Sequence, residues 1–213
     1  FLGSSRDPSQ RRPHWFTGFD PNDNLPLTNL SPGSPGNDLT RLYHVFNTTL
    51  NDVGPVGGRQ EWSESRGRSF VFTPLYSGSA ETGFVPTGRL GERGVSVGKA
   101  VAVSGAAATP NMGYHTSPVV SFLMAVFNIR LGWWQANPAR PALWRRDEPR
   151  LGLNATLADL PGQATRASAY VYLSDGGHFD NLGLYEMVRR RCREIVVVDA
   201  SCDPRYEYED LEN

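Results

Sequence analysis

The spacing of apolar and polar residues is most regular towards the carboxyl end of the chain. Residues 170–173 are apolar or aromatic and favour extended backbone, and residues 195–198 form a short, fully apolar run. Between them Leu184, Val188 and Cys192 recur every four residues, which predicts an amphipathic helix with its apolar side on a sheet. The fully apolar run at 195–198 is typical of a parallel strand covered on both faces. The segment therefore predicts strand, helix and strand, joined as one right-handed crossover.

A glycine turn separates the first of these strands from the helix. Gly176 and Gly177 follow Asp175 directly, and residues without a Cβ allow backbone conformations that are closed to others. Asp180 or Asn181 is placed to cap the start of the helix. Since the carboxyl ends of parallel strands are where ligands and catalytic groups gather, Asp175 is the first candidate for chemistry.

The rest of the chain is less regular. Residues 42–50 and 69–74 read as strands, separated by a polar turn at 51–60. Residues 1–39 are rich in Pro, Gly, Ser, Asn and Asp, which predicts an irregular connecting segment. Residues 135–168 combine prolines with clustered charges and are expected to form an insertion before the strand that ends at Asp175.

The longest apolar run, residues 118–127, is shorter than the roughly 18–20 residues of a membrane span. We interpret it as a buried helix. The alternative is that it contributes a wall for an acyl chain or an interfacial patch, and that the amphipathic rings of Trp133 and Trp134 assist it. The side chains that would line this wall are Phe122, Met124 and Phe127.

Composition narrows the class of protein. Hydrophobic residues make up 39% of the chain and can bury a core, and a net charge of −1 argues against electrostatic binding of nucleic acid. Two cysteines fit neither a disulfide framework nor a zinc site, which favours a reducing setting. His178 is expected to pack beside the Asp175 turn rather than to catalyse. The pattern predicts no metal site and no cofactor.

Two motifs resemble one known family. Asp175-Gly-Gly with Asn181 in the helix that follows, and the small-residue segment Gly94–His115 with Pro110, resemble the bacterial patatin-like phospholipases, relatives of the cytosolic phospholipase A2 catalytic domain. The resemblance covers roughly residues 40–213. It implies an α/β fold, a three-layer sandwich around a largely parallel central sheet, of which this chain holds the C-terminal part. Residues 1–39 would then connect to it.

The same resemblance implies a reaction. Asp175 would be the base of a Ser/Asp dyad in acyl transfer, and Gly176, Gly177 and Asn181 would shape its turn. The expected substrate is a phospholipid or another lipid ester, with peripheral membrane contact, no cofactor and no nucleic acid. The protein would be cytoplasmic or membrane-associated in a bacterium.

The nucleophile is expected outside the chain. The serines near Gly3, Ser77 and Val103 do not have the Gly-x-Ser-x-Gly spacing that these families use. The chain opens on Phe1 rather than methionine, and we expect it to be an internal part of a longer protein. The serine, the oxyanion loop and any membrane segments would precede it, and the isolated chain would be inactive.

Two other interpretations stay open. Asp175 and Asp199 would end neighbouring parallel strands, and with Asp203 they could bind Mg²⁺ in a metal-dependent phosphoesterase. Alternatively, the chain is a non-catalytic module that binds lipid or serves as a scaffold.

Overall fold

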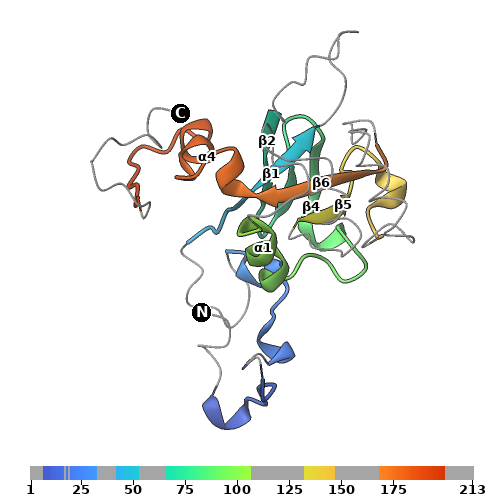
Figure 1. Cartoon of the computed structure of the whole chain (residues 1–213), viewed down its shortest axis with the longest axis vertical. Helices are drawn as coiled ribbons and strands as arrows, with labels where there is room; N and C mark the ends of the chain where they lie inside the picture. The colour runs from blue at the N-terminus through green and yellow to red at the C-terminus, as the bar shows by residue number, and fades with distance from the viewer. Residues whose placement is uncertain are drawn as a thin grey trace, which may run out of the picture.

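The structure, a computed structural model, describes residues 7–16, 18, 20–32, 42–52, 66–106, 132–146 and 168–199. A six-stranded sheet dominates these ranges (Figure 1). Its strands are β1 (Phe46–Asp52), β2 (Arg66–Phe72), β3 (Tyr76–Ser79), β4 (Gly83–Pro86), β5 (Trp133–Ala136) and β6 (Tyr170–Asp175). The helices are α1 (Val97–Ser104) and α4 (Leu184–Arg189). Short 3-10 turns are η1 (Pro8–Gln10), η2 (Pro21–Asp23), η3 (Leu27–Leu30), η4 (Thr87–Arg89), η6 (Pro141–Leu143) and η7 (Gly176–His178).

Every strand pair in this sheet is antiparallel, in the order β4-β3-β2-β1-β6-β5. The predicted three-layer α/β sandwich with a largely parallel central sheet is therefore wrong. Part of the reason lies in the connections, since only residues 73–75 and 80–82 join β2 to β3 and β3 to β4. A parallel pair needs a crossover of a dozen or more residues, so links this short can only reverse the chain.

Two of the predicted strands are confirmed with shifted ends. The strand expected at 42–50 appears as β1, and the strand expected at 69–74 appears as β2, so the two form an antiparallel hairpin. The strand expected at 170–173 is also confirmed, as β6. It lies between β1 and β5 and pairs antiparallel with both.

The second strand of the predicted crossover is not formed. Residues 195–198 belong to no strand of the described sheet, and Val196 and Val198 are 91% and 81% exposed. The prediction failed because an apolar composition shows only that a segment would gain from burial. It does not supply the neighbouring strand that would bury it.

Helix α4 presents a different face to the sheet from the one predicted. Val188 is 59% exposed and Cys192 is also exposed, while Glu186 is only 2% exposed. The α-helix ends at Arg189, so it is too short to carry the apolar repeat as far as Cys192. The Glu186 carboxylate accepts hydrogen bonds from polar groups on β2 and on the helix itself, as described below, and these bonds decide which face is buried.

The core lies between α1 and one face of the sheet. Because side chains alternate along a strand, β1, β2 and β6 each direct every second residue towards α1. The buried apolar side chains from these strands are Leu50, Phe70, Phe72, Val171 and Leu173, and α1 adds Val97, Ala100 and Val103. Leu27 of η3 is fully buried in the same cluster, so the N-terminal segment contributes to the core. None of the described helices is long and apolar enough to cross a membrane.

Candidate active site at the end of strand β6

Asp175 is the last residue of β6 and begins the glycine turn. Its Oδ1 accepts a hydrogen bond of 2.8 Å from the backbone N–H of Gly177, and its own N–H donates to the Ala106 carbonyl oxygen at 3.3 Å. The side chain is partly exposed. A carboxylate held by one backbone donor at a strand end keeps a fixed orientation and stays accessible, as a proton acceptor requires.

Close contacts rather than unusual backbone angles restrict the two glycines that follow, and only at Gly176 are the contacting atoms backbone. A Cβ on Gly176 would lie 2.6 Å from the Asn47 carbonyl oxygen, and a Cβ on Gly177 would lie 2.8 Å from Asn181 Oδ1. The Thr49 hydroxyl also approaches the Gly176 carbonyl oxygen, at 3.4 Å. The turn thus lies between β1 and the Asn181 side chain. The role of these residues in a catalytic site stays a prediction.

The two segments that carry the family resemblance lie next to each other at this turn. Ser104, at the end of α1, donates to the Asn47 carbonyl oxygen at 2.7 Å, and Asn47 is the residue against which Gly176 packs. Ala106, just beyond α1, accepts the Asp175 N–H. The end of the small-residue helix therefore forms one side of the Asp175 turn.

A serine and a histidine lie in contact on the opposite face of the sheet. Ser174 Oγ is 3.2 Å from His178 Nδ1 and accepts a hydrogen bond of 2.9 Å from Asn51 Nδ2. Because the Asn51 amide donates, the Ser174 hydroxyl can donate to His178. Ser174 is 0% exposed, so its oxygen cannot reach a substrate, and the contact is structural. The expectation that His178 packs beside the turn agrees with this placement.

The carboxylate of Glu186 fixes α4 to the sheet. Glu186 Oε1 accepts hydrogen bonds from Ser69 of β2 at 2.9 Å and from Arg189 Nε at 3.1 Å, and Oε2 faces Arg189 Nη2 at 3.1 Å and Arg190 Nε at 3.4 Å. Asp180 Oδ2 accepts the Tyr185 N–H in the first turn of α4 at 2.7 Å, but the N-cap residue is Gly183, so the prediction that Asp180 or Asn181 caps the helix is wrong. The sequence carried no signal for the burial of Glu186, because the residue lies on the charged side of the predicted helix.

The chain contains a Gly-x-Ser-x-Gly pattern that sequence reasoning passed over, Gly94-Val95-Ser96-Val97-Gly98. It lies at the start of α1, where Ser96 is the N-cap and its hydroxyl accepts the Lys99 N–H at 3.1 Å. The Ser96 backbone is extended, with φ −89° and ψ 158°, rather than the strained turn of a nucleophile elbow. The structure thus gives Ser96 a capping role.

Ser96 is also remote from Asp175. Ser96 precedes the first turn of α1, whereas the contact with Asp175 comes from Ala106, beyond the last turn. At a rise of 1.5 Å per residue, the eight residues of α1 separate these two ends by roughly 12 Å. The two side chains are therefore not within the hydrogen-bond reach that a dyad requires.

The remaining predicted positions fall into two groups. The expected acyl-chain wall, Phe122, Met124 and Phe127, lies outside the described residues. Trp133 and Trp134, proposed above to assist it, are partly buried in β5: Lys99 Nζ lies 4.5 Å from the Trp133 ring centre, and the Trp134 ring centre is 5.2 Å from that of Tyr172. Both indoles pack within the fold rather than face an interface.

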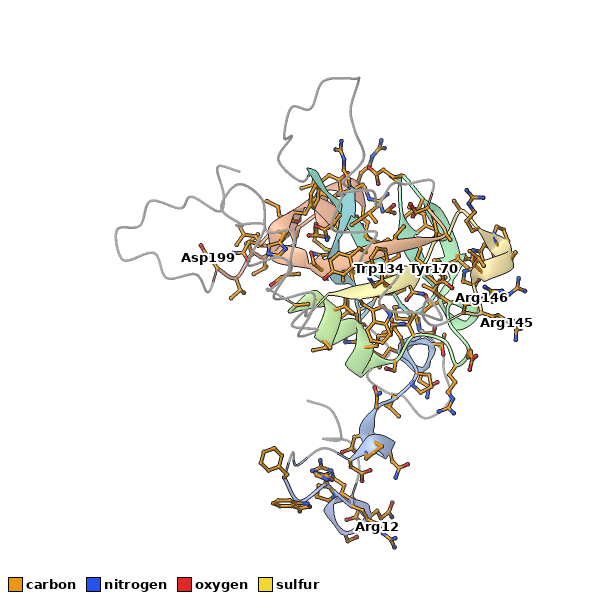
Figure 2. All side chains as sticks on the ribbon, turned by 45° about the vertical axis from the view of Figure 1, so that its right-hand side comes forward. Arg12, Trp134, Arg145, Arg146, Tyr170 and Asp199 are labelled. Atoms are coloured by element: carbon orange, nitrogen blue, oxygen red, sulfur yellow. The ribbon has the colours of Figure 1, made fainter. Side chains whose placement is uncertain are left out.

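The basis for a magnesium site is missing from the described part of the chain. Asp199 follows the unpaired run at 195–198 rather than a strand beside β6, and Figure 2 shows it well away from the sheet. Asp203 lies outside the described residues. Across the described ranges, no group of three His, Cys, Asp or Glu side chains could hold a metal ion.

The fold and the site together define an antiparallel-sheet protein with an accessible aspartate in a tight glycine turn. Comparison of the whole chain with protein-family models, with curated proteins and with solved structures finds no match. The resemblance to patatin-like phospholipases therefore stays a prediction that rests on the two sequence motifs.

Proposed function

We propose that Asp175 is the general base of a Ser/Asp dyad that hydrolyses a lipid ester, most simply a phospholipid, and that the nucleophilic serine comes from outside this chain. The observation that supports the proposal is the geometry of the turn. A partly exposed carboxylate ends a strand, a backbone N–H holds one of its oxygens, and the next residue, Gly176, leaves no room for a Cβ.

The proposed chemistry uses few groups. The serine hydroxyl attacks the ester carbonyl carbon while the Asp175 carboxylate accepts its proton, and the protonated Asp175 then donates to the departing alcohol. Water then attacks the acyl carbonyl carbon while Asp175 accepts its proton, and Asp175 returns this proton to the serine oxygen as the acyl–serine bond breaks and the fatty acid leaves. Because the Gly177 N–H occupies Oδ1, we assign the proton transfer to Oδ2. Because Gly176 and Gly177 carry no side chains, they leave space for the substrate to approach the turn.

The test requires the protein together with any residues encoded upstream of Phe1. We expect Asp175→Asn to lower turnover of a short-chain fatty-acid ester by about 10²–10⁴-fold, the usual contribution of a general base. Asp180→Asn is the matched control: it makes the same chemical change in the same turn, and its turnover should stay close to that of the wild type. Full activity in Asp175→Asn contradicts the proposal.

A fluorophosphonate probe, which bonds covalently to activated serines, then identifies the nucleophile. We expect labelling of the wild type and of Ser96→Ala, and loss of labelling in Asp175→Asn. Loss of labelling in Ser96→Ala together with an adduct on Ser96 would make Ser96 the nucleophile and would contradict the proposed dyad. Absence of labelling in the wild type would favour the alternative, a non-catalytic module that binds lipid or serves as a scaffold.

A further inference from the structure

A pair of large aromatic side chains lies at the tip of the N-terminal segment. Trp15 and Phe16 are 88% and 78% exposed, and their rings meet edge to face with centres 5.6 Å apart. They form the bend of a tight turn in which the Gly18 N–H donates to the His14 carbonyl oxygen at 2.8 Å. The Phe16 N–H also approaches His14 Nδ1, at 3.3 Å. We name His14, Trp15 and Phe16 the aromatic loop.

Buried carboxylates hold the base of the aromatic loop. Asp20 is 1% exposed and accepts the N–H of Arg12 at 2.8 Å and of Asn22 at 2.9 Å. Asp23 is 2% exposed, and its Oδ2 accepts from Arg11 Nε at 2.9 Å and Nη2 at 2.8 Å. The carboxylates of Asp20 and Asp23 are thus turned inward and bonded, while the aromatic rings of the loop are turned outward.

The segment is also tied to the sheet domain. The Leu27 N–H donates to the Val95 carbonyl oxygen at 2.8 Å, and Asn24 Oδ1 accepts the Gly98 N–H of α1 at 2.9 Å. Figure 2 shows Arg12 at the far end of this arm, away from the sheet. These hydrogen bonds therefore hold the arm that carries the aromatic loop in place. We expect the loop backbone to lose little additional conformational entropy when its rings bind to a surface.

We propose that the aromatic loop inserts into the headgroup region of a phospholipid bilayer. Tryptophan and phenylalanine favour this boundary, where the rings leave water and the indole N–H stays near polar groups. Arg12, which is exposed beside the loop, supplies a cation for a lipid phosphate, and neither Asp20 nor Asp23 presents a charge that would repel it. A second copy of the chain is the competing binding partner for the aromatic loop, and the test below distinguishes it from a bilayer.

Insertion rather than charge is expected to drive the binding. Asp7 is exposed on the same arm, and hydrogen bonds from the Ser9 backbone and hydroxyl lower the pKa of its carboxyl. The exposed side chains of Asp7 and Arg12 thus give this arm one charge of each sign. We therefore expect binding to zwitterionic vesicles that changes little between low and moderate salt.

The experiment measures flotation of the full chain with large unilamellar phosphatidylcholine vesicles. Trp15→Ser combined with Phe16→Ser should weaken the partition coefficient by about tenfold or more, since two aromatic side chains lose their burial. Tyr76→Ser, which removes another exposed aromatic ring from β3, is the matched control and should float like the wild type. Circular dichroism shows whether each variant is folded.

Each outcome decides the question. Failure of the wild type to float, or equal flotation of the double variant, overturns the proposal. The proposal is also overturned if the wild type does not bind vesicles but sediments as a dimer, and the double variant sediments as a monomer. That result would assign the aromatic loop to contact with a second copy of the chain. Asp175→Asn should bind vesicles normally, and the double variant should hydrolyse a water-soluble ester normally, so the membrane proposal and the dyad proposal can fail independently.

Discussion

Replacement of Gly176 by alanine tests the packing of the turn that holds Asp175. The added Cβ would lie 2.6 Å from the Asn47 carbonyl oxygen and 3.0 Å from the Asn47 carbonyl carbon, whereas ordinary contacts begin at 3.4 Å. Both neighbours are backbone atoms of β1, a strand paired on both sides, so they cannot rotate away as a side chain would. Either β1 or the turn must move.

The magnitude follows from the usual penalty for overpacking, about 1–3 kcal/mol. For a domain of this size, each kcal/mol shifts the melting temperature by about 2–4 °C. A cost of about 2 kcal/mol therefore predicts that Gly176→Ala melts about 4–8 °C below the wild type. Thermal unfolding followed by circular dichroism measures the change.

Gly88→Ala is the matched control. Gly88 has no positive φ, and its added Cβ would meet only Thr28 Cγ2, at 3.5 Å, which is an ordinary contact. Alanine there restricts mainly the unfolded chain and should stabilise the protein by up to about 1 kcal/mol. The two substitutions should therefore have opposite signs. If Gly176→Ala melts as high as Gly88→Ala, the glycine turn is not pressed against β1, and the reasoning about the site is refuted.

Two further predictions concern the polar contacts beneath the turn. Glu186→Gln should lower the free energy of unfolding by about 1–2 kcal/mol in urea titrations, because its charged hydrogen bonds weaken while the partly exposed Arg189 and Arg190 regain water. The exposed control Glu194→Gln should leave the free energy of unfolding unchanged, and equal stabilities of the two variants would show that the Glu186 carboxylate does not anchor α4. Ser174→Ala should cost about 1–3 kcal/mol in the same titration because Asn51 Nδ2 loses its 2.9 Å partner; a loss of turnover in the folded variant would instead place Ser174 in the chemistry.

Local features of this protein could be predicted from sequence alone. The β-favouring run at 170–173, the tight turn at Gly176 and a hydrogen bond from the start of α4 back to Asp180 all appear in the structure close to where the sequence indicated them, although the N-cap is Gly183. Each depends on short-range sterics or on a hydrogen bond between near neighbours. A sequence window of a few residues contains all that such features need.

The partners of these elements could not be predicted in the same way. The strand that ends at Asp175 pairs with β1 and β5, which are remote in sequence, and the apolar run at 195–198 that was expected beside it has no partner in the described sheet. Apolar periodicity records how much a segment gains from leaving water. It does not record which neighbour covers the segment or in which direction that neighbour runs.

The same distinction applies to the candidate site. The sequence by itself determined that an aspartate ends a strand and that two glycines follow it. Only the tertiary structure decided that β1 presses on Gly176, that Ser69 of β2 binds the buried Glu186, and that α1 separates Ser96 from Asp175. These outcomes depend on which distant groups meet, because a buried carboxylate needs partners that a sequence window does not contain.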